Sequence, residues 1–280
     1  MPAESTPFSV HSDGVTLSGE GGGSGPPIVL LHGLTATRRY VVMGSRSLER
    51  SAHRVLSYDA RGHGRSTPAP DAGAYGYEHL AADLEEVLDT LGISRAALAG
   101  ASMGAHTAVR LALRRPERVA ALALVTPSFD PSEPRTPEAF ARWDALAQGL
   151  REGGVEGFVE AYDLPAVPES WRETVEKVLR QRLSAHEHPE AVADALEVVP
   201  RSRPFDDMRE LEELEVPTVV VASRDEADPG HPLAVGERYA RAIPGARLVV
   251  EDVGPPARSP IAWQGGQLSR VLAELLARTA

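Results

Sequence analysis

One serine stands in a setting that is typical of a nucleophile. Residues 100–104 read Gly-Ala-Ser-Met-Gly, so Ser102 is the centre of a G-x-S-x-G pattern. The apolar run 96–99 comes before it, and a helical pattern over Met103–Arg114 follows. Small flanking residues allow a sharp strand-to-helix turn, which exposes the hydroxyl at a helix N-terminus. We therefore predict that Ser102 is a nucleophile and that the Met103 amide donates to a developing oxyanion.

A second motif follows the apolar run 55–58. Residues 59–66 read Asp-Ala-Arg-Gly-His-Gly-Arg-Ser and fit D-x-R-G-x-G-x-S. We interpret its polar side chains, Asp59, Arg61 and Ser66, as structural groups that bond the loop together. This loop, the His-Gly pair after residues 27–31 and the serine motif have the order and spacing of α/β-hydrolase-fold proteins. The chain resembles esterases, epoxide hydrolases, haloperoxidases and proline-iminopeptidase-like enzymes of that superfamily, over residues 27–126 and partly over 217–280.

The resemblance implies the positions of further site residues. In that fold the loop after the first buried strand supplies a second oxyanion amide, which here is that of Leu34. His32 lies in the same loop and is expected beside the substrate. The acid of the triad should follow the strand 217–222, which implies Asp225. Asp228 is a rival, because it shows the same spacing to a following proline.

The histidine that completes the family's triad is missing from its usual place. It normally follows the last strand in a Gly-His turn, but residues 254–256 read Gly-Pro-Pro and no histidine occurs beyond His231. A serine hydroxyl is a poor nucleophile without an adjacent base. A substitute base is one interpretation, with His231 as the first candidate and His32 and His106 as others. The alternatives are a lyase, isomerase or cyclase reaction in the same pocket, or ligand binding without turnover.

The segment 259–267 stands where the histidine loop should lead into the last helix. It contains Trp263 and Gln264, and one hypothesis is that both form a wall of the pocket and contact the substrate. The other interpretation is that Trp263 anchors the last helix to the core.

Strand-like and helix-like segments alternate along the chain, which predicts the α/β class, with a mostly parallel sheet flanked by helices. This alternation stops between residues 127 and 214, where several helical patterns occur but no convincing strand pattern. This stretch is too long for a simple connection. We therefore predict a core domain of residues 1–126 and 215–280 with an inserted helical cap of residues 127–214.

Composition narrows the function further. The net charge of −11 argues against nucleic acid or an anionic membrane as a partner, and the absence of cysteine excludes disulfides and thiolate metal sites. We see no secretory signal and no apolar run of membrane-spanning length, so a cytoplasmic protein is expected. The family's acyl chemistry implies no cofactor, and we expect no metal site. The prediction is hydrolysis of a small-molecule ester, amide or related acyl substrate by Ser102, with Asp225 orienting His231; oligomeric state is not predicted.

Overall fold

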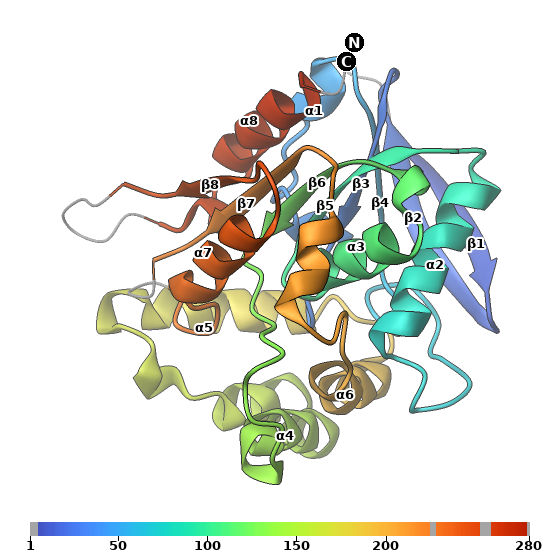
Figure 1. Cartoon of the computed structure of the whole chain (residues 1–280). Helices are drawn as coiled ribbons and strands as arrows, with labels where there is room; N and C mark the ends of the chain where they lie inside the picture. Colours follow the sequence, from blue (N-terminus) through green and yellow to red (C-terminus); the bar gives the residue numbers. More distant parts are fainter. Residues whose placement is uncertain (1–4, 225–227, 253–258, 279–280) are drawn as a thin grey trace.

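A mostly parallel sheet forms the centre of the molecule (Figure 1). The computed structural model describes residues 5–224, 228–252 and 259–278. In these residues eight strands pair in the order β1-β2-β4-β3-β5-β6-β7-β8. The pairs β1–β2 and β2–β4 are antiparallel and the others are parallel, which confirms the predicted fold class. The strands are β1 (Thr6–Ser12), β2 (Val15–Gly22), β3 (Pro27–Leu31), β4 (Arg54–Tyr58), β5 (Ala96–Ala101), β6 (Val119–Val125), β7 (Thr218–Ala222) and β8 (Arg247–Val250).

Helices cover both faces of this sheet (Figure 1). The helices α2 (Tyr77–Thr90), α3 (Met103–Arg114) and α7 (Leu233–Ala242) pack on one face, and α1 (Ser47–Arg50) and α8 (Gly265–Leu276) pack on the other. Strand β6 shows why its sequence is apolar throughout. Leu122 and Leu124 join one apolar cluster, whereas Ala121 and Ala123 join the other, because alternate side chains point to opposite faces. No helix among those described is long and apolar enough to span a membrane.

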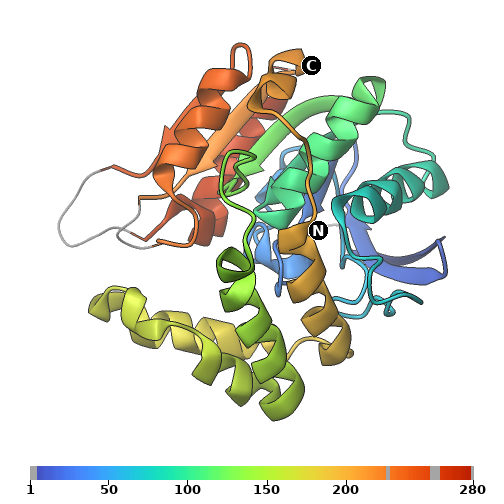
Figure 2. The ribbon, with the colours of Figure 1, turned by 60° about the horizontal axis from the view of Figure 1, so that its bottom comes forward.

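Residues 127–214, here called the helical insertion, contain helices and no strand. They form α4 (Pro137–Ala161), α5 (Glu169–Leu183) and α6 (Pro189–Val198), together with the 3-10 helices η3 (Leu164–Ala166), η4 (Val199–Arg201) and η5 (Met208–Glu213). Gly154 interrupts α4, with φ 59° and ψ −140°. Figures 1 and 2 show α4, α5 and α6 together at one end of the sheet.

The helical insertion has an apolar cluster of its own, in which Leu150 and Phe158 of α4 pack with Leu196 of α6. A second cluster joins it to the rest of the chain, because Ala195 of α6 packs with Met103 and its neighbours. The 3-10 helices η1 (Arg38–Tyr40), η2 (Pro116–Arg118) and η6 (Ile261–Trp263) lie outside the insertion. The division into a core domain and a cap domain stays a prediction.

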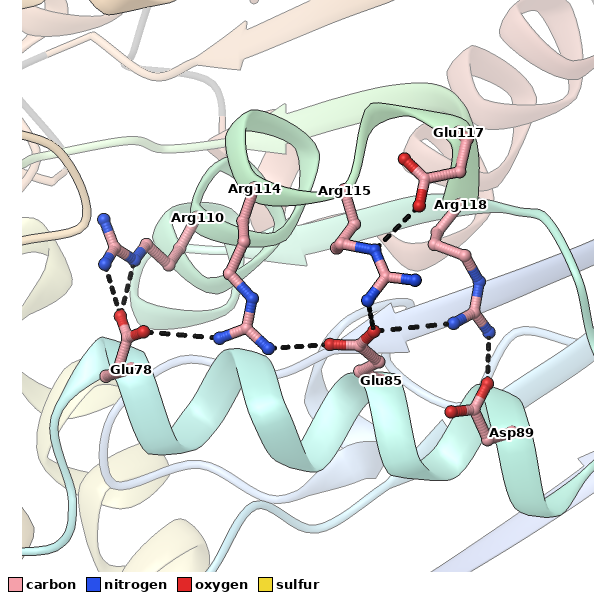
Figure 3. Close-up of polar contacts among 8 residues, drawn as sticks. All are labelled: Glu78, Glu85, Asp89, Arg110, Arg114, Arg115, Glu117 and Arg118. Atoms are coloured by element: carbon pink, nitrogen blue, oxygen red, sulfur yellow. Dashed lines mark hydrogen bonds and ion pairs between the residues drawn. The ribbon is translucent and has the colours of Figure 1, made fainter.

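Ion pairs fix α3, whose N-terminus follows Ser102, against α2 (Figure 3). Arginines at the end of α3 and in η2 face acidic residues of α2. Glu78 pairs with Arg110 and Arg114, Glu85 with Arg114, Arg115 and Arg118, and Asp89 with Arg118. Glu85 is the most buried of these acids, since its side chain is 13% exposed. The shared partners make a network rather than isolated surface pairs, which individually contribute little.

Candidate active site

Ser102 lies in a strained turn between β5 and α3. Its backbone has φ 49° and ψ −113°, a combination that costs a non-glycine residue on the order of 1–3 kcal/mol. The Ser102 amide donates to the carbonyl of Val125 at 2.9 Å, which ties the turn to β6. The two motif glycines are required for packing. A Cβ on Gly104 would lie 2.2 Å from the carbonyl oxygen of Leu31, and one on Gly100 would lie 2.2 Å from the backbone of Gly104.

Ser102 opens into a cavity of about 310 Å³ between the sheet and the helical insertion. Met103 and Leu34 line it beside Ser102, and Phe140 and Trp143 of α4 line it from the insertion. The loop between β7 and α7 contributes further lining through residues 229, 230 and 232. Among the described residues, the Ser102 hydroxyl makes no hydrogen bond, so it is available to a ligand.

The two predicted oxyanion donors lie at this cavity. Met103 is the first residue of α3, and the first amides of a helix have no intrahelical acceptor. Leu34 also lines the cavity, and its amide has no acceptor within the described part of the chain. Both donors are therefore free for an oxygen of a bound carbonyl.

The loop that carries Leu34 is held by α5 and the turn after it. Arg182 donates through Nη2 to the Leu34 carbonyl at 2.9 Å and to the Thr35 hydroxyl at 2.5 Å. His186 donates through Nε2 to the Thr35 carbonyl at 2.9 Å. Thr35 has a φ of 64°, which is unfavourable for a β-branched residue. Side chains of the insertion thus hold this loop in its strained form, and burial of Arg182 lowers its pKa.

Two of the three candidate bases have both ring nitrogens engaged. His32 donates from Nδ1 to the Gly33 carbonyl and accepts at Nε2 from the Ala60 amide, both at 2.8 Å. His106 accepts at Nε2 from the amides of Ser128 and Phe129, each at 3.1 Å, and donates from Nδ1 to a tyrosine hydroxyl. These partners assign the tautomers. Burial lowers the pKa of each ring to about 3, so both are neutral and neither can accept the Ser102 proton.

His32 therefore has a different place from the one expected of a substrate contact. It lies beside a small void behind Met103, and the described lining of the large cavity does not include it. Its bond from the Ala60 amide joins the β3 loop to the β4 loop, and its bond to the Gly33 carbonyl fixes the ring within the β3 loop. The ring serves as a brace between these loops.

The third candidate, His231, is paired with a carboxylate. Its Nδ1 lies 2.9 and 3.0 Å from the two carboxylate oxygens of Asp228, so Nδ1 carries the proton and Nε2 is a free acceptor. The pair sits in the loop after β7, and the neighbouring residues 229, 230 and 232 line the cavity. No hydrogen bond joins His231 to Ser102 in the described residues. The predicted acid Asp225 lies outside the described residues.

Trp263 and Gln264 are not brought to the described cavity wall. The indole of Trp263 makes an edge contact with Trp171 of α5, with ring centroids 5.6 Å apart. Gln264 donates from its side-chain amide to the carbonyl of Ser259. Trp263 therefore joins the segment before α8 to the insertion, a contact that neither the substrate hypothesis nor anchoring to the core anticipated.

The loop 59–66 is bonded together as interpreted. Asp59 accepts from the amides of Arg38 and Arg65, at 2.8 and 3.1 Å. Ser66 donates to the Asp59 carbonyl at 2.6 Å, and Arg61 forms a buried ion pair with Asp83 of α2. These contacts hold the loop rigidly without offering a group to a ligand.

Several charged residues of the cavity carry no motif that would mark them in the sequence. Asp130 forms an ion pair with Arg238 of α7 and accepts from Ser132. Arg135 and Arg142 line the cavity from the helical insertion. Around these two arginines the sequence shows a helical pattern with charges at irregular positions, which does not indicate that their side chains line a cavity. The described ranges hold no group of three or more His, Cys, Asp or Glu side chains suited to an ion.

Comparisons with known proteins identify the family of the chain. The family model for the alpha/beta hydrolase fold matches residues 26–257. A protein of Pseudomonas savastanoi pv. phaseolicola named "Putative carbamate hydrolase RutD" is 30% identical over 230 residues, which is 82% of this chain and 86% of that protein. The enol-lactonase of Burkholderia xenovorans LB400 is 28% identical, with a TM-score of 0.78 over 96% of this chain and 100% of its own. A thermophilic esterase of Thermogutta terrifontis, solved with malate bound, is also 28% identical, with a TM-score of 0.78 over 99% of each chain. The chain belongs to the α/β-hydrolase fold family.

Proposed function

We propose that the protein hydrolyses a small carboxylic ester, lactone or related acyl compound through Ser102. The observation that carries this proposal is the strained Ser102 backbone at the cavity, beside the free amides of Leu34 and Met103. Strain of this kind persists only where the surrounding structure enforces it, and it is common at catalytic serines. The relatives named as an esterase, an enol-lactonase and a carbamate hydrolase support acyl cleavage.

The proposed reaction begins with attack of the Ser102 oxygen on the carbonyl carbon. The hydroxyl proton passes to Nε2 of His231, while Asp228 holds Nδ1–H and stabilises the charged ring. The Leu34 and Met103 amides donate to the oxyanion. The tetrahedral intermediate then expels the alcohol, which takes the proton from His231, and water hydrolyses the acyl-serine by the same steps.

Asp228 replaces Asp225 as the acid in this proposal, because it already bonds His231. The base must reach Ser102 directly or through one water molecule when substrate is bound, since hydrogen bonds of catalytic groups are often long in the free enzyme. A cavity of about 310 Å³ is at the small end of ligand sites and suits a small substrate.

The test combines covalent labelling with turnover. The pure protein is treated with a fluorophosphonate probe, the adduct is mapped by mass spectrometry, and p-nitrophenyl acetate hydrolysis is measured in parallel. Labelling should occur at Ser102 and disappear in Ser102→Ala. His231→Gln and Asp228→Asn should each slow labelling and turnover by at least about 10²-fold, as loss of a triad member does. Asp225→Asn is the matched control and should leave most of the activity.

Other outcomes discriminate the alternatives. A folded protein that is neither labelled nor active on any ester would refute the proposal and favour ligand binding without turnover. One observation favours ligand binding without turnover: the Ser102 hydroxyl has no hydrogen-bonded base in the described structure. Turnover that survives Ser102→Ala would instead indicate a lyase, isomerase or cyclase reaction in the cavity.

A further inference from the structure

We propose that the cavity recognises an anionic group of the substrate through Arg135 and Arg142, so that the substrate is an acyl compound with a second, free carboxylate. That the ligand is a substrate rests on the proposed function, whereas binding of its carboxylate does not depend on turnover. It starts from two guanidinium groups that line the cavity without a carboxylate partner among the described residues.

Arg135 is held in place by neutral groups. Its Nη2 donates to the carbonyl oxygens of Pro200, at 3.5 Å, and of Arg201, and its guanidinium lies over the ring of Phe140 at 5.3 Å. Its Nε and Nη1 have no hydrogen-bond partner in the part of the chain that the structure describes. Partial burial and the nearby charge of Arg203 lower the pKa of Arg135, so its positive charge is incompletely compensated. The carbonyls and the ring fix the position of the Arg135 guanidinium but do not neutralise its charge, so an anionic ligand can pair with it.

Arg142 lies further along α4 and is directed toward the loop between β7 and α7. Its guanidinium stacks over the Trp143 ring at 5.0 Å. Its Nη2 would lie 3.9 Å from a Cβ built on Gly230, a residue that also lines the cavity. No ion pair to Arg142 is present in the described structure. Both arginines therefore approach the cavity from the insertion, opposite the residues contributed by β5 and α3.

Other charged groups near these two arginines already have partners. Asp228, whose Oδ1 would lie 3.7 Å from the same Gly230 Cβ, is bonded to His231. Arg201, which stacks on the same Phe140 ring at 4.7 Å, has a carboxylate partner in Asp144 at 2.8 Å. Asp130, the buried acid of the cavity, is already engaged by Arg238 and Ser132. The remaining acid of the lining, Glu133, is exposed and has no ion pair among the described residues.

Arg135 and Arg142 thus bring to the cavity two positive charges that have no ion-pair partner among the described residues. A guanidinium presents a planar set of N–H donors that matches a carboxylate, and such charge-assisted bonds are stronger than neutral ones. Because the arginines and Ser102 share one small cavity, the ligand that fits both is short. It carries its acyl carbon at Ser102 and a carboxylate at the insertion side, as a monoester of a dicarboxylic acid or a lactone of a hydroxydicarboxylic acid does.

The test measures binding in full-length Ser102→Ala protein, which cannot form an acyl-enzyme. Monomethyl glutarate and dimethyl glutarate have the same chain and differ in one charge. By calorimetry at low salt the monoester should bind at least about tenfold more tightly, and the preference should weaken as salt rises. Arg135→Met and Arg142→Met, each added to Ser102→Ala, should each reduce monoester affinity about tenfold and leave diester affinity unchanged. Glu133→Gln should strengthen monoester binding.

Arg209→Met is the matched control, because it changes net charge equally at an exposed residue outside the described cavity lining. Arg135→Gln is a second variant in case the methionine variant does not fold, and thermal melting verifies folding. Equal affinity for the two esters, or a preference that both arginine variants retain, overturns the inference. Failure of the proposed function would give a different result. If wild-type Ser102 is not labelled but the monoester still binds in an arginine-dependent way, the hydrolase proposal is refuted and the carboxylate site is supported.

Discussion

Replacing Arg182 by methionine is expected to lower kcat by about 10²-fold with little change in KM. Arg182 does not contact Ser102 and does not itself line the described cavity; it acts by holding the Leu34 carbonyl and the Thr35 hydroxyl. Methionine keeps most of the aliphatic packing and removes both donors. The change therefore tests whether the helical insertion positions an oxyanion amide.

The magnitude follows from the contacts. Hydrogen bonds from a charged donor contribute about 1.5–3 kcal/mol each, and Arg182 makes two of them. The positive φ of Thr35 costs on the order of 1–3 kcal/mol, so loss of both bonds is sufficient to release it. Relaxation of Thr35 rotates the adjoining peptides and displaces the Leu34 amide. Loss of one oxyanion donor typically reduces kcat by roughly 10²–10³-fold.

Steady-state hydrolysis of the best ester from the labelling experiment gives kcat and KM separately. A merely structural role for Arg182 would lower the melting temperature and the active fraction, whereas a positioning role lowers kcat of folded, active-site-titrated enzyme. Arg182→Lys keeps one charged donor and should recover part of the loss. The control is Arg180→Met on the same helix, where the side chain pairs only with exposed glutamates. A folded Arg182→Met enzyme with kcat within twofold of wild type refutes the reasoning.

Three further predictions concern stability. Glu85→Gln weakens three ion pairs of the α2–α3 network and should lower the free energy of unfolding in urea by about 1–2 kcal/mol; no change would mean that the network contributes nothing. Gly104→Ala forces a Cβ against the backbone and should cost more than about 3 kcal/mol, whereas Gly266→Ala, which meets nothing within 4 Å, should be neutral or stabilising in thermal melts. His32 and His106 are neutral when folded, with pKa values lowered to about 3, so below the ordinary histidine value of about 6.5 the unfolded chain binds more protons. Stability should therefore fall by up to about 2 kcal/mol per histidine at about pH 5, and a melting temperature constant from about pH 8 to pH 5 would contradict their burial.

The fold class could be predicted from the sequence because the residue patterns that indicate strands and helices are local. The apolar run 27–31 and the helical pattern over Met103–Arg114 are set by neighbouring residues, and they have the bounds of β3 and α3. In these elements the local sequence alone indicates the backbone conformation.

The candidate site was accessible only in part. The elbow at Ser102 follows from five consecutive residues, and the free Met103 amide follows from the start of a helix. The choice between Asp225 and Asp228 could not be made, because it depends on which carboxylate faces His231. Engagement of both His32 nitrogens by backbone groups of two loops was equally invisible, since no sequence pattern reports where a ring nitrogen finds its partner.

The two strained residues of the site show where this limit comes from. The φ of 49° at Ser102 is supported by its own motif, since Gly100 and Gly104 remove the side chains that would clash. The φ of 64° at Thr35 is supported by Arg182 and His186, which lie 147 and 151 residues further along the chain. A local motif therefore determines the backbone conformation of Ser102, whereas the conformation of the loop that carries Leu34, the proposed second oxyanion donor, depends on the helical insertion being in place. It follows that substitutions in the insertion can alter catalysis without touching the substrate, and that comparison of the elbow alone cannot tell an active member of the family from a silent one.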